Sequence, residues 1–159
     1  MTTRRATKAD AGAMARIYNQ GIEDRIATFE TRLRTPADVE GWFDDTHPIV
    51  VAEETGQIVG FASTSSYRPR KCYAKIAEFS VYVGRDRRGR GVGTQVLEAL
   101  IEESRKAGLH KLVSRIFPEN AASRAACRAA GFREVGVYKA HGQLDGAWKD
   151  CVIVERLVG

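Results

Sequence analysis

The chain has 159 residues, of which 43% are hydrophobic and 28% charged, as in a single globular domain spanning residues 1–159. No apolar run is long enough to span a membrane, and the N-terminus lacks the apolar centre of a signal peptide. Because the net charge of +5 is modest and the densest basic cluster has no interleaved aromatics, neither a membrane nor a nucleic acid is an expected partner.

The first half of the chain predicts two helices placed between strands. Ala13 and Ile17 recur at helical spacing in the first helix. Thr35 as N-cap, Pro36 in the first turn and Asp38 near the positive end of the dipole mark the start of the second. The expected elements are a strand over 4–6, a helix over 9–24, a loop over 25–34, a helix from 35 to about 44, and strands over 48–53 and 57–65.

The second half predicts two further helices and a closing hairpin. Gly108 and Gly131 are natural helix stops, Asn120 is a natural N-cap, and Asp145-Gly146 is a two-residue turn signal. The expected elements are a basic loop over 67–72, strands over 74–83 and 111–117, helices over 91–107 and 121–130, and strands over 132–143 and 147–157. This order favours a mixed α+β sheet over a regular βαβ series.

The most informative motif is Arg-Arg-Gly-Arg-Gly-Val-Gly-Thr at 87–94, between the strand over 74–83 and the helix over 91–107. Glycines at alternate positions let the backbone turn tightly and approach a ligand. The start of the helix leaves amides unpaired at the positive end of its dipole, and the arginines add full charges. The motif therefore predicts a polyphosphate site.

Three kinds of phosphate loop compete for this motif. A P-loop fails because Gly93 is followed by Thr94 and Gln95, where lysine and then a hydroxyl residue are needed. A Rossmann fingerprint fails on its spacing, its placement in the chain and a missing acidic residue. The remaining interpretation is a loop that binds the pyrophosphate of coenzyme A.

Residues beyond the loop carry a family resemblance. They are Arg88-x-x-Gly91-x-Gly93 after the strand end Val81-Tyr82-Val83, followed by Asn120, Ser123 and Gly131-Phe132. This pattern resembles the GCN5-related N-acetyltransferase (GNAT) superfamily. The resemblance implies an α+β fold with a mixed, mostly antiparallel central sheet flanked by helices, and acetyl-CoA as co-substrate. No metal is expected, since the three cysteines lack metal-ligand spacing.

A closer similarity is to the phosphinothricin N-acetyltransferase family. The residues that carry it are Ile17-Tyr18-Asn19, Thr28-Phe29-Glu30, Arg70, Tyr73, Glu78-x-Ser80-Val81-Tyr82-Val83 and Asp145-Gly146-x-Trp148-x-Asp150. The similarity implies acetylation of the α-amine of a small amino-acid analogue such as phosphinothricin, arsinothricin or methionine sulfoximine. It also implies a homodimer.

The resemblance assigns roles to particular residues of the coenzyme site. The backbone at Val81, Tyr82 and Val83 is expected to bind the pantetheine arm like an added strand. The remaining coenzyme residues are Arg88, Gly89, Arg90, Gly91, Val92, Gly93 and Thr94 at the pyrophosphate, with Asn120 and Ser123 from the following helix. Asn120 is equally well explained as a helix cap, and one of the loop arginines is expected to be merely solvated.

Glu78 matches the family's catalytic glutamate. Because an ammonium has no lone pair, the acceptor amine must lose a proton, and Glu78 is the candidate base, assisted by one water and by partial burial among apolar strand residues. The alternative is a solvated charge or a salt bridge between strands. Phe29, Arg70 and Tyr73 are the candidate acceptor residues, since a guanidinium suits carboxylate and phosphinate groups. Phe29 alternatively anchors its loop, and Arg70 belongs to a basic loop that is otherwise expected to be exposed.

Cys127 stands where many superfamily members have a tyrosine that protonates the leaving thiolate, so no dedicated acid is assigned. With no histidine near it in sequence, Cys127 is expected to be a small buried residue, and the transfer to be direct, without an acyl-enzyme. An odd number of cysteines favours the reducing cytoplasm. Rival functions are acetylation of a polyamine, an aminoglycoside or a protein N-terminus, and coenzyme binding without catalysis. The basic loop argues against polycationic acceptors.

Overall fold

Neighbouring residues of the strands point into two different apolar cores, one on each face of a central sheet. In the computed structural model, which describes residues 1–159, Val50 and Ala52 of strand β2 (Ile49–Glu54) lie in one core, whereas Ile49 and Val51 lie in the other. This is the two-residue period of a strand. Burial on both faces explains why residues 49–52 are all apolar.

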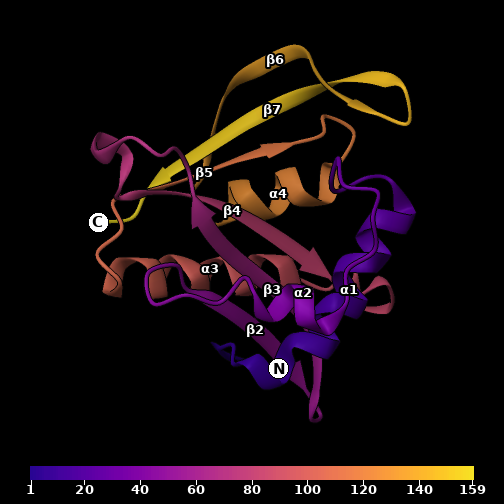
Figure 1. Ribbon diagram of the computed structural model, residues 1–159, viewed down its shortest axis with the longest axis vertical. Coiled ribbons are helices and arrows are strands. Elements are labelled where there is room, and N and C mark those ends of the chain that lie inside the picture. The colour runs from indigo at the N-terminus through magenta and orange to yellow at the C-terminus, as the bar shows by residue number, and fades with distance from the viewer.

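Seven strands form one sheet in the order β1-β2-β3-β4-β5-β7-β6 (Figure 1). Every neighbouring pair is antiparallel except β4 and β5, which run parallel. The other strands are β1 (Thr2–Arg5), β3 (Gln57–Ser66), β4 (Ile76–Val83), β5 (Lys111–Ile116), β6 (Arg133–Leu144) and β7 (Ala147–Leu157). The expected mixed, mostly antiparallel α+β sheet is confirmed.

Two helices cover each face of the sheet. On one face, α1 (Ala11–Asp24) and α2 (Pro36–Glu40) pack on the core that contains Phe61 and Tyr82. On the other face, α3 (Val92–Lys106) and α4 (Ala121–Ala129) pack on the core built around β4 and β5. None of these helices is both long and apolar enough to cross a bilayer.

Four predicted boundaries differ from the structure by two residues or more. The strand predicted over 4–6 is β1 at Thr2–Arg5, because its pairing with β2 begins at Thr2. The first turn of the helix predicted over 9–24 is a 3-10 turn at Lys8–Asp10, and α1 begins at Ala11. Helix α2 ends at Glu40 instead of near residue 44, because the next amides, of Trp42 and Phe43, bond three residues back and the helix tightens into a turn. The strand predicted from residue 74 begins at Ile76, since Lys71–Tyr73 forms a 3-10 turn.

The closing hairpin extends beyond the rest of the sheet (Figure 1). Asp145 and Gly146 both adopt positive φ, 51° and 81°, as the predicted two-residue turn requires. An ion pair of 2.9 Å between Arg25 and Asp145 ties the end of α1 to this turn. The hairpin and the segment after α1 therefore lie side by side.

Candidate active site

The two parallel strands separate half-way along β4. They pair only at Ile76–Lys111, Ala77–Leu112 and Glu78–Val113, although β4 continues to Val83. Where they part, the Ser114 hydroxyl donates to the Phe79 carbonyl at 2.8 Å. Since successive backbone groups of a strand point to alternate sides, the rest of β4 presents an unpaired edge toward β5.

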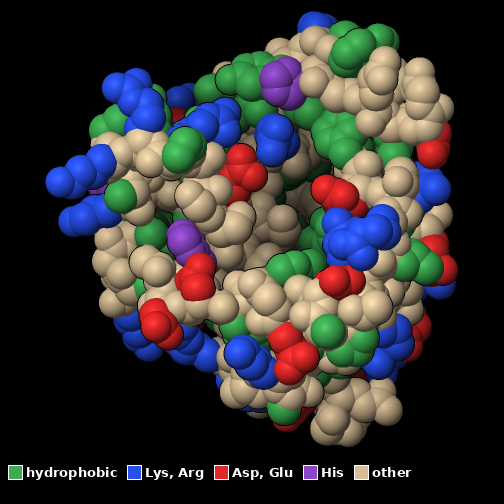
Figure 2. All heavy atoms as spheres, viewed as in Figure 1, with side chains coloured by type: hydrophobic (Ala, Val, Ile, Leu, Met, Phe, Trp, Pro, Cys, Tyr) green, Lys and Arg blue, Asp and Glu red, His purple; other side chains and the backbone are tan.

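A cavity of about 570 Å³ occupies this opening. Figure 2 shows a hollow between β4 and β5 with acidic and basic side chains along its rim. The free edge of β4, the glycine-rich loop and the first turns of α3 and α4 form its walls. All the predicted coenzyme residues except Arg90 line it, namely Val81, Tyr82, Val83, Arg88, Gly89, Gly91, Val92, Gly93, Thr94, Asn120 and Ser123.

Backbone conformation requires glycine at two positions of the loop but not at the third. Gly89 and Gly91 adopt φ of 78° and 81°, a left-handed conformation that L side chains rarely adopt. Gly93 is helical, and a Cβ there would lie 3.6 Å from the Ala126 side chain, an ordinary contact. The first helical hydrogen bond of α3 runs from Gln95 N to Gly91 O, so the amides of residues 92–94 have no partner within the helix.

The loop arginines are held from α1. Asp24, the last residue of that helix, accepts from Arg88 Nη1 at 2.7 Å and from Arg85 Nη2 at 2.9 Å. These bonds, first Arg85 and then Arg88, lower the pKa of the Asp24 carboxyl. Arg90 is exposed and lies outside the cavity wall. The guanidinium of Arg88 is thus positioned by a residue far away in sequence.

Asn120 does two things with one side chain. Its Oδ1 accepts from Ser123 N at 3.2 Å and so caps α4, as predicted. Its Nδ2 donates to the Ile26 carbonyl at 3.3 Å. The cap therefore also connects α4 to the segment that follows α1.

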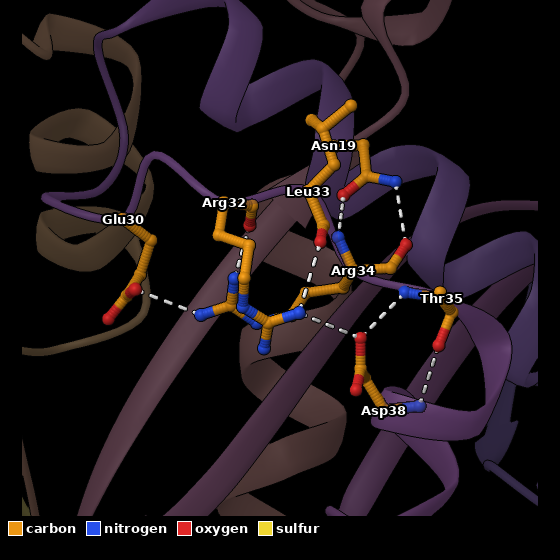
Figure 3. A network of polar contacts seen from close by, with 7 residues as sticks. All are labelled: Asn19, Glu30, Arg32, Leu33, Arg34, Thr35 and Asp38. Carbon is orange, nitrogen blue, oxygen red and sulfur yellow. Dashed lines mark hydrogen bonds and ion pairs between the residues drawn. The ribbon is translucent and has the colours of Figure 1, made fainter.

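That segment is fixed by the network in Figure 3. The Asn19 side chain accepts from Arg34 N at 2.8 Å and donates to Arg34 O at 2.9 Å. The one side-chain amide therefore binds both the backbone N–H and the backbone carbonyl of Arg34. The Arg34 guanidinium pairs with Glu30 at 2.9 Å and lies over the Tyr18 ring. The Tyr18-Asn19 part of the sequence motif thus clamps the loop over residues 25–34.

Glu78 lies at the point where the strands part, but its surroundings are not the apolar ones expected. Both carboxylate oxygens are 3.4 Å from Arg115 Nη2, and the Glu78 side chain is 28% exposed. Arg115 follows the last paired residue of β5 by two positions and therefore points to the same side of the sheet as Val113 and Glu78. The structure gives Glu78 a cationic neighbour in place of an apolar pocket.

The predicted acceptor residues lie outside the wall of this cavity. Phe29 packs edge-on against Phe117 with ring centroids 4.8 Å apart, and a Cβ on Gly142 of β6 would lie 2.8 Å from the Phe29 ring. Phe29 therefore anchors its loop against the hairpin. Tyr73 packs against Tyr67, and Arg70 is exposed at the start of the 3-10 turn.

Comparison with known proteins identifies this arrangement. The sequence model of the Acetyltransferase (GNAT) family matches residues 15–132, which include the strand opening, the glycine-rich loop and Gly131-Phe132. The chain belongs to the GNAT family of N-acetyltransferases. Its seven-stranded sheet with four helices matches GNAT structures.

Three similar proteins are informative. A Pseudomonas aeruginosa L-methionine sulfoximine/L-methionine sulfone acetyltransferase is 37% identical over 96% of this chain and 91% of its own length. A Sinorhizobium meliloti phosphinothricin acetyltransferase, solved with acetyl-CoA, has a TM-score of 0.90 and 31% identity over 99% of this chain and 88% of its own. A Brucella melitensis ribosomal-protein-alanine N-acetyltransferase has a TM-score of 0.93 and 37% identity over 99% of both chains.

In this GNAT chain, Cys127 is the small buried residue that the sequence predicts. It is buried in the cavity wall, and desolvation raises the pKa of its thiol to about 12. A thiol in that state holds its proton at neutral pH. All three cysteines are free, and no group of three or more His, Cys, Asp or Glu side chains is placed to hold a metal ion.

Sequence reasoning missed the side chains that organise the site from other elements. Asp24 holds the loop arginines, Ser114 bridges the strands, and Arg115 faces Glu78. None of these three residues belongs to a sequence motif that would mark it. Arg115 was accessible only by applying the strand period to β5, and that requires knowing that β5 runs beside β4.

Proposed function

We propose that this GNAT enzyme transfers the acetyl group of acetyl-CoA to the α-amine of a small amino-acid analogue, of the methionine sulfoximine, phosphinothricin or arsinothricin type. The observation that carries the proposal is the cavity between the parted strands, which joins an open strand edge, a helix N-terminus and a glycine loop. Glu78 lies just outside its wall and pairs with Arg115, which lines it. The relatives' activities favour this acceptor class.

The cavity suits acetyl-CoA in three ways. The unpaired edge at Val81, Tyr82 and Val83 matches a pantetheine arm, whose amides bond as an added strand would. The free amides of Val92, Gly93 and Thr94, with Arg88 beside them, match a diphosphate. Asn120 and Ser123 border the same space from α4. When bound there, the coenzyme supplies an activated acetyl thioester.

Glu78 acts as the base, through one water if the amine lies beyond direct reach. It takes a proton from the acceptor ammonium, and the freed lone pair forms the new bond to the carbonyl carbon. The carbon–sulfur bond breaks, the thiolate leaves with the bonding pair, and the nitrogen loses its second proton to solvent as the amide forms. A backbone N–H on the open edge of β4 stabilises the charge on the carbonyl oxygen. Solvent protonates the thiolate, because the raised pKa of the Cys127 thiol makes it too weak an acid to do so.

The acceptor side chain lies on the side of β4 that carries Glu78. Arg70 binds its acidic group, Tyr73 borders the pocket, and Phe29 shapes it by holding the loop over 25–34 against the hairpin. Arg90, outside the cavity wall, meets the outer part of the coenzyme. The roles of Arg70 and Tyr73 are the ones that the family resemblance implies, whereas the resemblance places Arg90 in the pyrophosphate loop.

A homodimer accompanies this function. The hairpin exposes apolar side chains at the edge of the sheet: Val137 and Tyr138 on the edge strand β6 are 48% and 52% exposed, and Trp148 on the neighbouring β7 is 62% exposed. Such a patch on an unpaired edge strand suits a second copy of the chain. The free cysteines suit a reducing compartment such as the cytoplasm.

Thiol release from acetyl-CoA tests the proposal. The panel contains L-methionine sulfoximine, L-methionine sulfone, phosphinothricin, arsinothricin, ordinary amino acids, polyamines and a peptide with an N-terminal alanine. Release with the amino-acid analogues above all others supports the proposal. Preference for the peptide supports protein acetylation instead, the activity named for the Brucella neighbour. Release with none of the amines, from folded protein that binds the coenzyme, contradicts the proposed enzyme.

A further inference from the structure

We propose that Arg115 binds the α-carboxylate of the acceptor and so makes this enzyme selective for α-amino acids over simple amines. The inference rests on the proposed function and adds a specificity-determining residue to it. Nothing in the sequence motifs marks Arg115, and its role follows from where β5 places it.

Arg115 is the cation closest to the proposed base. Its Nη2 lies 3.4 Å from both oxygens of Glu78, and its side chain is 46% exposed, so a ligand can reach it. It also lines the cavity beside Ser114 and Ile116, just beyond the point where β4 and β5 part. Any amine close enough to deliver a proton to Glu78 is therefore close to this guanidinium.

The pair has the opposite arrangement of charge to an amino-acid zwitterion. In an α-amino acid the ammonium and the carboxylate sit on the same carbon, so the two charges are neighbours. Glu78 offers a carboxylate to the ammonium, and Arg115 offers a planar fork of donors to the carboxylate. Binding exchanges one long, solvent-exposed ion pair, which stabilises the fold little, for two pairs with the ligand.

Nearby charges leave Arg115 free for this task. Lys149, on the same side of β7 by the strand period, is bound to Glu119 and lies over the Phe117 ring. Asp150 bonds to the Ala140 amide at 2.7 Å and to Lys139. Arg70 lies in the segment that joins β3 to β4, at the start of the 3-10 turn. For an acceptor with two acidic groups, such as phosphinothricin, we assign the α-carboxylate to Arg115 and the second acidic group to Arg70.

The test compares an acid with its own carboxamide. Initial rates of thiol release are measured for L-methionine sulfone and L-methionine sulfone carboxamide, with wild type, Arg115→Gln and Arg115→Lys. The control is Arg133→Gln, which removes another arginine from an ion pair between strands, with Glu155, away from the cavity. Thermal shift with acetyl-CoA confirms that each variant folds and binds the coenzyme.

We expect Arg115→Gln to raise KM for the acid by about 10- to 100-fold and to leave KM for the carboxamide within about threefold, the loss expected for a charge-assisted hydrogen bond. Arg115→Lys restores part of the affinity for the acid, and Arg133→Gln changes neither value. An equal loss for acid and carboxamide, or a lower kcat with unchanged KM for both, overturns the role of Arg115 while the proposed function stands. A wild type that acetylates neither the acid nor any other panel amine overturns both.

Discussion

The two ends of the cleft are built from different parts of the chain. At the proposed coenzyme end the wall is mainly backbone: the unpaired edge of β4, two glycines with positive φ and the first amides of α3. At the proposed acceptor end the available groups are mainly side chains, from Glu78 on β4, Arg115 on β5 and the clamped loop over 25–34.

This difference explains which part of the function is general. A backbone site recognises what every acetyl-CoA carries, a diphosphate and a chain of amides, and it needs only glycine and the right dihedral angles. A side-chain site changes with a single substitution. We therefore expect the coenzyme end to be similar throughout the GNAT family and the acceptor end to be specific to this chain.

The largest expected effect is on turnover, and it comes from a substitution that leaves coenzyme binding unchanged. Glu78→Gln removes the base but keeps the shape, so we expect kcat to fall by about 100- to 10,000-fold, the usual contribution of a general base. Acetyl-CoA affinity, measured by calorimetry, is expected to stay within about threefold. Equal turnover in wild type and variant removes Glu78 from the mechanism and leaves it as one half of a salt bridge.

The coenzyme end is tested by Gly91→Ala. A left-handed residue with a Cβ costs about 1–2 kcal/mol, and here the strain falls on the N-cap of α3. We expect acetyl-CoA affinity to drop by about 10-fold and KM for the acceptor to change little. The matched control is Gly12→Ala in α1, where an added Cβ meets nothing within 4 Å. If both variants bind acetyl-CoA as wild type does, the loop conformation is not what holds the diphosphate.

The acceptor end is tested by Asn19→Ala, which removes both bonds to the Arg34 backbone. We expect a stability loss of about 1–3 kcal/mol in urea unfolding, from two hydrogen bonds, and a several-fold rise in KM for the acceptor alone. Asn19→Asp keeps the bond from Arg34 N and loses the one to Arg34 O, so about half of the effect is expected. A matching rise in KM for acetyl-CoA would mean that the loop serves both ends.

The smallest effect concerns Asp24 and the loop arginines. Because Arg85 and Arg88 lower the pKa of its carboxyl below 3.8, the stabilisation is present above that value and is lost as the pH falls through the folded-state pKa. Asp24→Asn is thus expected to melt slightly below wild type at neutral pH and together with it once the pH is below the folded-state pKa of Asp24. A difference that persists in acid would mean that the residue acts through packing.

Sequence predicted most of the fold and most of the residues that line the cavity, for physical reasons. Gly89 and Gly91 signal positive φ, Asn120 signals a cap, and the run 76–83 signals a buried strand, all by local chemistry. The acceptor end was predicted only in part, because contacts such as Arg115 with Glu78 or Asn19 with Arg34 depend on strand order and loop path. Phe29 illustrates the limit: its position in a polar loop marked it, but only the structure shows it against Phe117 and Gly142.

Hydrogen exchange with and without acetyl-CoA tests most directly the claim that the parted strands hold the coenzyme. The account predicts slower exchange on addition of acetyl-CoA for amides in residues 79–83 and 88–94, with the β6–β7 hairpin unchanged. Saturating acetyl-CoA that protects neither segment, or protects only residues outside the cavity, would contradict it.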